Sequence, residues 1–269
     1  MLNGFKVAVL AATAIALAVA PSALAQDADR PERIGDEPNL NGIWQAMNSA
    51  NWNLEPHPAA AIEQFSRELG AIAAVPAGRG VVDGGEIPYQ PDALSQRDEN
   101  RANWPAADPE AKCYLPGIPR ATYLPHPFQI VQGGGDILMV YEYAATNRVI
   151  NMTEHSEPPI DTWMGVSNGS WDGDTLVVET TGLNGESWLD RAGNYASAAA
   201  TVTERFTPQG DNILLYEATI EDPETFTEAW TISMPLYRHV EPDAQLLEFR
   251  CVPFSELMLY GDLLLEEDE

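Results

Sequence analysis

The chain has 269 residues, with 41 acidic side chains against 14 lysines and arginines, which gives a formal net charge of −27 at pH 7. A surface this acidic repels nucleic acids and anionic lipids, so neither is expected as a partner. The length is sufficient for one large all-β domain or two small domains with a substantial core.

The first 25 residues have the pattern of a secretory signal peptide. Lys6 precedes an apolar run over residues 7–20, and Ala23 and Ala25 supply small side chains at positions −3 and −1 before Gln26. The run is too short to span a hydrocarbon core of about 30 Å, and no second apolar stretch of spanning length follows. We therefore expect cleavage between Ala25 and Gln26, and a soluble protein in the periplasm or secreted, without membrane insertion.

Residues 26–39 are polar and charged, which predicts a flexible leader. Residues 40–125 open with a short strand and then become rich in turn signals, so we expect an arm of helices and loops packed on a core built elsewhere. Within the arm, apolar residues at spacings of three and four predict a helix over residues 59–74, and residues 91–103 predict a second short helix. A disordered linker is the alternative for this stretch.

From Phe128 onward, apolar and polar side chains alternate with a period of two, as they do in half-buried antiparallel strands. Glycine, proline, asparagine and aspartate clusters separate the alternating segments. After Phe128 these segments cover residues 137–143, 149–153, 175–180, 201–207, 214–220, 230–236 and 247–251. The rhythm predicts a mainly β fold over residues 126–260, a single antiparallel β-barrel or a sandwich, followed by an acidic tail at 261–269.

Two segments share a Gly-x-Trp pattern, Gly42-Ile43-Trp44 and Gly169-Ser170-Trp171. The first resembles the Gly-x-Trp that opens the first strand of lipocalins, which implies a lipocalin-like barrel. A barrel with inward aromatic side chains and one or two polar groups suits a small, partly apolar or aromatic ligand. The side chains expected to bind this ligand combine rings with guanidinium groups: Tyr141, Trp163, Trp188, Arg120 and Arg148.

Longer motifs between residues 87 and 260 are specific when taken together. They include Lys112–Arg120 (KCYLPGIPR), Trp171–Val178 (WDGDTLVV) and Trp188–Asp190 (WLD). In these motifs the chain resembles a family of exported proteins of Gram-negative bacteria. The resemblance implies export and carries over no activity and no catalytic residue.

Cys113 and Cys251 are expected to form a disulfide, because an even pair in an exported chain is most simply bonded. Two inert thiols or a catalytic thiol are the alternatives, although no cysteine–histidine spacing supports catalysis. None of the four histidines pairs with another at a spacing typical of metal ligands, so we predict neither a metal nor another cofactor.

Glu204 is the first of three candidates for acid–base chemistry. Strand alternation places it on the same side as Val202 and Phe206, inward if that side faces the core. A buried carboxylate must be paired or must take up a proton more readily. The functional interpretation is a general acid or base in a cavity, and the structural interpretation is an ion pair with an arginine such as Arg148.

Asp190 and His155 are the other two candidates. Asp190 lies in a loop beside Trp188, where stacking and an edge hydrogen bond would suit a sugar or phenolic ring. An Asx turn or an ion pair with Arg191 is its structural alternative. His155 lies in an acidic loop at a strand end, where a base at a barrel mouth is expected, and an exposed histidine without a role is the alternative.

Three functions follow from these observations. The first is a barrel that binds a small, partly apolar or aromatic molecule. The second is a lyase, isomerase or hydrolase that uses His155, Asp190 and Glu204, with Arg148 or Arg120 stabilising an anion. The third is a protein-interaction or scaffold module. The fold does not choose among them, and the sequence predicts no oligomeric state.

Overall fold

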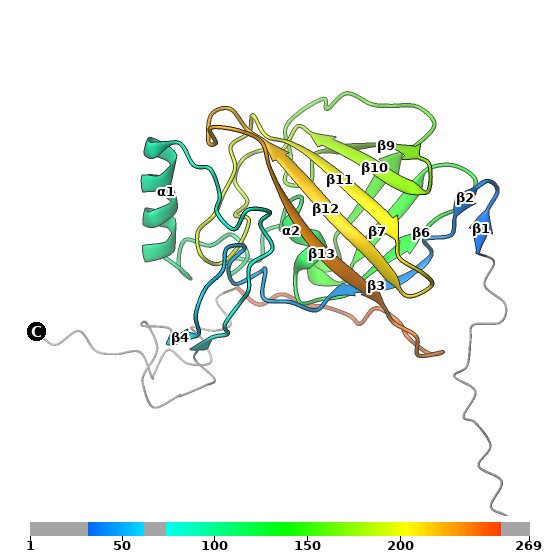
Figure 1. Cartoon of the computed structure of the whole chain (residues 1–269), viewed down its shortest axis with the longest axis horizontal. Helices are drawn as coiled ribbons and strands as arrows, with labels where there is room; N and C mark the ends of the chain where they lie inside the picture. Colours follow the sequence, from blue (N-terminus) through cyan, green and yellow to red (C-terminus); the bar gives the residue numbers. More distant parts are fainter. Residues whose placement is uncertain (1–31, 62–73, 254–269) are drawn as a thin grey trace, which may run out of the picture. The chain divides into compact units, whose positions relative to one another are not determined.

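A closed barrel of nine strands is the centre of the fold, and the structure, a computed structural model, describes residues 32–61 and 74–253 (Figure 1). The signal peptide, most of the helix predicted over residues 59–74 and the acidic tail therefore lie outside the described residues. The barrel strands are β3 (Gly42–Ala46), β6 (Phe128–Val131), β7 (Ile137–Tyr141), β8 (Asn147–Asn151), β9 (Val166–Asp172), β10 (Thr175–Thr181), β11 (Thr201–Pro208), β12 (Ile213–Glu221) and β13 (Trp230–Arg238).

The strand order around the barrel is β10-β11-β12-β13-β3-β6-β7-β8-β9. Neighbouring strands are antiparallel except β8 and β9, which are parallel, with Ile150 opposite Ser167. The predicted barrel is thus confirmed, but its wall is mixed rather than fully antiparallel. A parallel pair needs a long connection, and the proline-bearing loop over residues 152–165 supplies it.

Most of the alternating segments form the expected strands, but one of them forms none, and one strand of the barrel was not expected. Strand β9 was not expected, because small residues such as Ser167 and Gly169 occupy its buried positions in place of large apolar ones. A Cβ on Gly169 would lie 2.5 Å from a side-chain carbon of Ile150, so the close approach of β8 and β9 requires glycine. Residues 247–251 form no strand; Phe249 packs instead against Tyr143.

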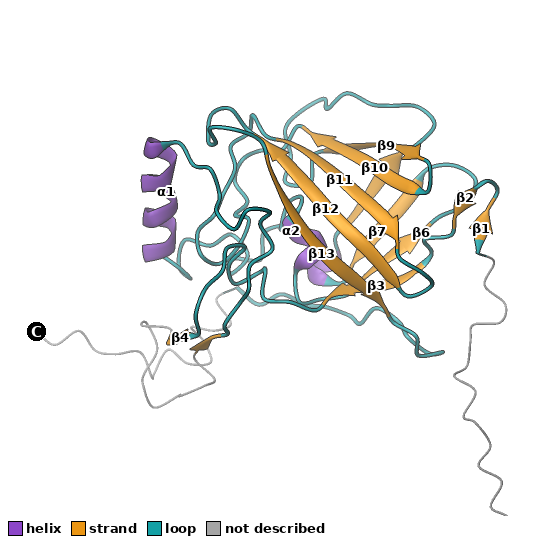
Figure 2. Ribbon diagram, in the orientation of Figure 1, coloured by secondary structure: helices purple, strands orange, loops and turns teal. Residues whose placement is uncertain are grey.

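Large side chains fill the interior of the barrel, whose strands are the orange arrows of Figure 2. Each strand turns alternate residues inward, because successive side chains of a strand point to opposite faces. The indole Nε1–H of Trp44 donates to the carbonyl oxygen of Leu40 (2.9 Å), which satisfies its polar atom inside the core. The largest fully buried rings are those of Trp44, Tyr123, Phe128, Tyr141, Phe206 and Tyr216.

The other elements are short and come mainly from the N-terminal half. They are β1 (Arg33–Ile34), β2 (Glu37–Pro38), β4 (Ala60–Ala61), β5 (Ala74–Val75), helix α1 (Pro91–Ala102), helix α2 (Arg120–Tyr123) and the 3-10 turn η2 (Tyr143–Ala145). Helix α1 confirms the predicted second helix and begins with a proline at its first position, where the missing N–H is not needed. Within the described residues, no helix is long and apolar enough to cross a membrane.

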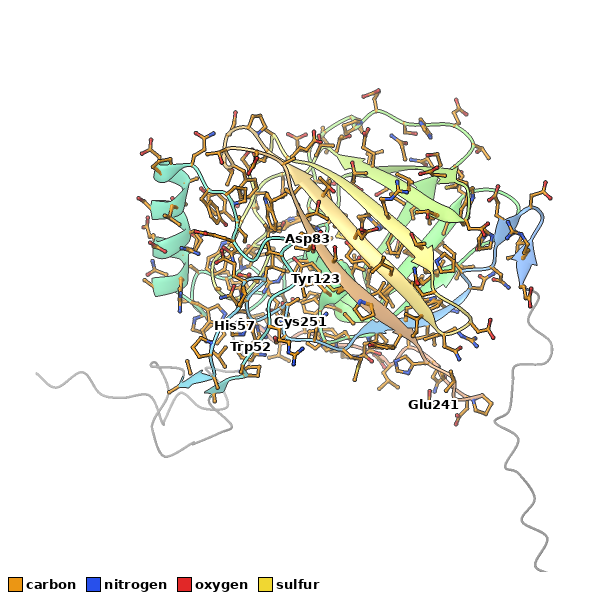
Figure 3. The ribbon with its side chains drawn as sticks, in the orientation of Figure 1. Trp52, His57, Asp83, Tyr123, Glu241 and Cys251 are labelled. Carbon is orange, nitrogen blue, oxygen red and sulfur yellow. A yellow bond between two sulfur atoms is a disulfide. The ribbon has the colours of Figure 1, made fainter. Side chains whose placement is uncertain are left out.

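Helix α2 connects this N-terminal part to the barrel interior. All four of its residues are buried, and the hydroxyl of Thr122 lies 3.5 Å from Glu204 of β11. The adjacent Tyr123 hydroxyl donates to the carbonyl oxygen of Leu189 (2.7 Å). Figure 3 shows Tyr123 among the barrel strands and Trp52 and His57 near β4 and β5. The helix therefore lies between the barrel interior and the loops that form the candidate site.

The disulfide predicted between Cys113 and Cys251 is present and joins positions 138 residues apart. It fastens the segment after β13 to the loop before α2. Phe249, two residues before Cys251, packs edge-on against His126 with ring centroids 4.8 Å apart. The alternatives of free or catalytic thiols are thereby corrected, because a bonded cysteine has no thiolate.

Candidate functional site

Glu204 and Arg148 form an ion pair inside the barrel, as the structural alternative predicted. The Arg148 Nη1 lies 2.7 Å from the Glu204 Oε2, and their side chains are 3% and 0% exposed. The Tyr216 hydroxyl donates to the second carboxylate oxygen at 2.8 Å. Burial opposes the charge on Arg148, but the Glu204 carboxylate outweighs it and raises the pKa of the guanidinium.

The surroundings of this pair are polar and fully enclosed. Arg148 Nη1 also contacts the Ser167 hydroxyl at 3.4 Å, and the Tyr141 hydroxyl lies 3.5 Å from that of Thr122. Burial raises the pKa of Tyr141, so its hydroxyl stays protonated at neutral pH. Arg148 and Tyr141, which were predicted to bind a ligand, are therefore buried in the core, where they contact other protein side chains.

A second charged cluster lies beside α2, outside the barrel wall. Arg120 binds both carboxylate oxygens of Asp108 (3.1 and 3.2 Å) and one oxygen of Glu110 (2.7 Å). Glu110 in turn accepts two hydrogen bonds from Arg191, both at 2.9 Å. Burial alone would raise the pKa of Glu110, but Arg191 and Arg120 lower it to about 2. Glu110 thus bridges two arginines, and the predicted ligand-binding group Arg120 is fully committed to this cluster.

Asp190 fixes the loop that carries Arg191. Its carboxylate accepts hydrogen bonds from the backbone N–H groups of Leu54 (2.8 Å), Ala192 (2.9 Å) and Asn194 (3.2 Å), and from the side-chain amide of Asn194 (2.6 Å). The bond to Ala192 is the Asx turn that the structural alternative predicted. Burial raises the pKa of Asp190 to about 6 despite these donors. Asp190 therefore ties the Arg191 loop to the chain at Leu54.

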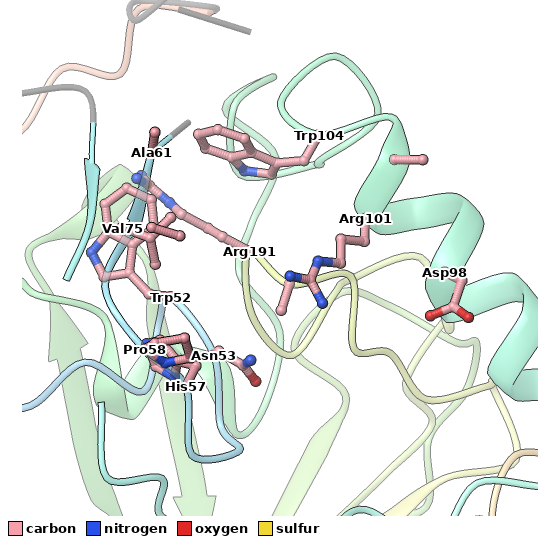
Figure 4. A pocket seen from close by; sticks show the side chains of 13 residues that line it. Trp52, Asn53, His57, Pro58, Ala61, Val75, Asp98, Arg101, Trp104 and Arg191 are labelled. Atoms are coloured by element: carbon pink, nitrogen blue, oxygen red, sulfur yellow. The ribbon is translucent and has the colours of Figure 1, made fainter. Parts of the chain in front are cut away.

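The cluster and the loop together build one wall of a pocket of about 630 Å³ (Figure 4). The indoles of Trp52 and Trp104 lie at 58° to each other with centroids 6.1 Å apart. The Arg191 guanidinium lies over both, 4.6 Å from the Trp52 ring centre and 5.8 Å from that of Trp104. The end of α1 forms the opposite wall, through Asp98 and Arg101.

A second hollow of about 490 Å³ shares two of these residues. Trp52 and Asn53 line both hollows, and the second also includes Met47 and Arg79. The His57 and Gly78 backbones pair between them, and a Cβ on Gly78 would lie 2.3 Å from the imidazole ring, so this contact requires glycine. The segment around Trp52 therefore divides two adjacent depressions.

His57 has an unusual environment in the pocket wall. Its Nδ1 lies 2.8 Å from the carbonyl oxygen of Glu55, which can only accept a hydrogen bond, so Nδ1–H is the donor. The Nε2 atom is buried and has no hydrogen-bond partner in the part of the chain that the structure describes. Sequence reasoning assigned His57 no role, and the structure places it beside Trp52 and Asn53.

The predicted site residues are distributed over separate places. His155 is exposed on its loop and donates from Nε2 to the Gly169 carbonyl oxygen (3.1 Å). Trp163 stacks on Tyr114, with ring centroids 5.0 Å apart and planes 9° from parallel. Trp188 is buried and belongs with Trp104 to a small apolar cluster. None of the eight predicted catalytic and ligand-binding residues lines the 630 Å³ pocket.

The pocket residues that sequence reasoning missed have one weak signal in common. Trp52 and Trp104 are large rings in a part of the chain that is otherwise rich in proline, alanine and acid. Rings in such a segment have few apolar partners in their own neighbourhood, so they pack on distant loops or line a depression. Within residues 32–61 and 74–253, no group of three or more histidine, cysteine, aspartate or glutamate side chains could hold a metal ion.

Comparison with known proteins assigns no family: no protein-family model matches the chain, and no curated protein matches it. The family resemblance seen in the sequence motifs therefore stays a prediction. The functional argument rests on the geometry of the site.

Proposed function

We propose that this protein binds a small, partly apolar or aromatic molecule, and that the molecule lies in the pocket of Trp52 and Trp104. The observation that carries the proposal is this pocket of about 630 Å³ with two indole rings in its wall. Small-molecule sites typically measure about 300–1,000 Å³ and combine apolar or aromatic walls with a few polar groups. The barrel acts as the rigid support of the site rather than as its container.

The filled barrel supports this location. Large side chains and the Arg148–Glu204 pair occupy the interior, and both of the depressions described above lie outside it. An enclosed ion pair contacts a diffusing ligand only if the barrel opens. The pocket of Trp52 needs no such opening, since Trp52 itself is only partly buried.

Rigid walls also support a binding function. Arg191 is held over Trp52 by the two hydrogen bonds to Glu110, and its loop is held by Asp190. Walls that are fixed before the ligand arrives lose little conformational entropy on binding. The acid–base alternative lacks comparable support, because His155, Asp190 and Glu204 do not share this pocket.

The test is a thermal-shift screen of a library of small aromatic and aliphatic compounds, followed by calorimetry on the hits. We expect hits, and we expect Trp52→Ala to weaken them about tenfold or more, because an indole contributes a large apolar contact area. Tyr237→Ala is the matched control, since Tyr237 is an exposed ring on β13 far in sequence from the pocket. A library without hits, or hits that survive Trp52→Ala unchanged, would overturn the proposal.

We also propose that the protein is exported after cleavage between Ala25 and Gln26. The Cys113–Cys251 disulfide supports export, because such bonds persist in oxidising compartments. Expression of the full chain in a Gram-negative host should yield a periplasmic or secreted protein whose first residue is Gln26, read by mass spectrometry. Uncleaved chain confined to the cytoplasm would contradict this.

A further inference from the structure

The charges that line the pocket have the opposite sign to the chain as a whole. Two arginines, Arg101 and Arg191, line it together with one carboxylate, that of Asp98. Asp98 is paired with the Nε of Arg97 at 2.8 Å, and Arg191 is paired with Glu110 at 2.9 Å. The charge of Arg101 is therefore the one in the pocket wall that has no counterion among the described residues. In a chain with a formal charge of −27, a pocket with more cationic than anionic groups is a local exception. It favours ligands that carry negative charge.

Of the two arginines in the pocket wall, Arg101 is the one whose charge no described residue pairs. It stands in the last turn of α1, is exposed, and has no hydrogen-bond or ion-pair partner among the described residues. One turn earlier, Arg97 contacts the carboxylates of both Asp98 and Glu55. A cation is favoured at a helix C-terminus, which explains a positive charge at this position. It does not explain a guanidinium whose N–H donors meet no protein acceptor on a strongly acidic chain.

Asn53 supplies a second donor. Its Oδ1 accepts a hydrogen bond from the backbone N–H of Glu55 (2.9 Å), which fixes the orientation of the amide. The Nδ2 group is therefore a donor, and it has no acceptor among the described residues. Figure 4 shows the Arg101 side chain reaching from α1 into the space that Asn53 and Arg191 border.

These groups define the chemistry of the ligand. Guanidinium and amide N–H groups can only donate, so the ligand must supply acceptor oxygens, and a carboxylate accepts two parallel bonds from one guanidinium. The indoles of Trp52 and Trp104 require an apolar or aromatic body. Building on the proposed function, we propose that the ligand is a small aromatic carboxylic acid whose carboxylate is bound by Arg101 and Asn53.

The test compares three compounds with the same ring system on the full mature protein by calorimetry: naphthalene-2-carboxylate, 2-naphthalenemethanol and 2-naphthylmethylamine. We expect the carboxylate to bind about tenfold or more tightly than the alcohol, as charge-assisted hydrogen bonds generally permit, and the amine to bind weakest. Raising the salt concentration should weaken only the carboxylate.

Arg101→Gln should reduce the ratio of carboxylate to alcohol affinity to about one, because it removes the charge that distinguishes the two ligands. Arg79→Gln is the matched control, because it removes the same charge from an exposed arginine that lines only the neighbouring depression. Both residues are exposed, so both variants should keep the fold, which circular dichroism checks.

The outcomes separate this inference from the proposed function. If all three compounds bind Trp52-dependently with equal affinity, or if Arg101→Gln keeps the preference for the carboxylate, the inference is overturned and the proposed function stands. If none of the three compounds binds, the inference is overturned, while the library screen still decides the proposed function. Binding that appears only after residues 62–73 are replaced by a glycine-serine linker would show that the chain's own segment occupies the pocket, and would also overturn the inference.

Discussion

The ion pair in the barrel allows a direct test of how the charged groups of the interior contribute to stability. Arg148 on β8 and Glu204 on β11 are in contact at 2.7 Å with almost no exposure. We consider three variants: Glu204→Gln, Arg148→Met, and the double variant. Glutamine keeps an acceptor for the Tyr216 hydroxyl, which now bonds to Glu204 at 2.8 Å, so Glu204→Gln removes charge without leaving this hydroxyl without an acceptor.

Each single variant leaves one buried charge without its counterion, which destabilises a protein by about 3–5 kcal/mol. In the double variant both charges are gone, the hydroxyl acceptor remains, and methionine fills most of the arginine's space. We therefore expect the double variant to lose only about 0–2 kcal/mol, since replacing both members of a buried pair is often neutral or better. The coupling free energy between the two positions should then be about 3 kcal/mol or more.

Urea unfolding followed by circular dichroism measures the free energy of unfolding of the parent and the three variants. Ligand affinity should stay at the parent value in every folded variant. A double variant that loses the sum of the two single losses would refute the reasoning, because the contact at 2.7 Å would then contribute nothing.

Three further predictions concern stability. Acidification from pH 6 to about 4.5 should raise the free energy of unfolding, because burial raises the pKa of Asp190 from 3.8 to about 6 and the folded state therefore takes up the proton first. Acidification below about pH 4.5 should lower it, because two arginines hold the pKa of the buried Glu110 at about 2. Asp190→Asn should remove only the first effect, and parallel pH curves for parent and variant in urea melts would contradict it. Reduction of the disulfide, which closes a separation of 138 residues, should lower the free energy of unfolding by up to about 4–5 kcal/mol, and an unchanged urea midpoint would contradict this. Gly165→Ala should destabilise more than Gly173→Ala: both glycines have φ near +60°, but only at Gly165 would the new Cβ lie 2.5 Å from the Thr181 carbonyl oxygen, and equal thermal midpoints would refute the clash.

The period-two alternation predicted most of the barrel, because in a half-buried strand the apolar residues face the core and the polar residues face the solvent. The inward position of Glu204 followed from Val202 and Phe206 beside it, and the structure confirms all three as buried. The sequence of strand β9 shows no such alternation. Its buried residues are small because β8 approaches closely, and that closeness is a property of the partner strand, which local patterns do not contain.

The candidate site was harder to predict for a different reason. Trp52, Trp104 and Arg191 come from three segments without hydrophobic periodicity, and long-range hydrogen bonds bring them together. The decisive contacts are the carboxylates of Glu110 and Asp190, which reach Arg191 and Leu54 across 81 and 136 positions of sequence. The sequence singled out Asp190 as a candidate for acid–base chemistry, with an Asx turn as the alternative, and the structure shows the Asx turn. Its bond to Leu54 could not be foreseen from neighbouring residues, so its support of the pocket wall was missed.

The two charged clusters explain why the barrel is closed and the pocket lies beside it. In the barrel, the charge of Arg148 is matched by Glu204, and among the described residues only the buried Nε of this guanidinium is left without a hydrogen-bond partner. Beside α2, Glu110 is shared between Arg120, which is buried, and Arg191, which is partly exposed in the pocket. A buried charge stays in one position, because moving it away from its counterion would leave it both desolvated and unpaired. Glu110 therefore connects the rigid core to the guanidinium of Arg191, which contacts solvent. Although Arg191 lies in an irregular loop, this contact fixes its position in the pocket wall as a strand would.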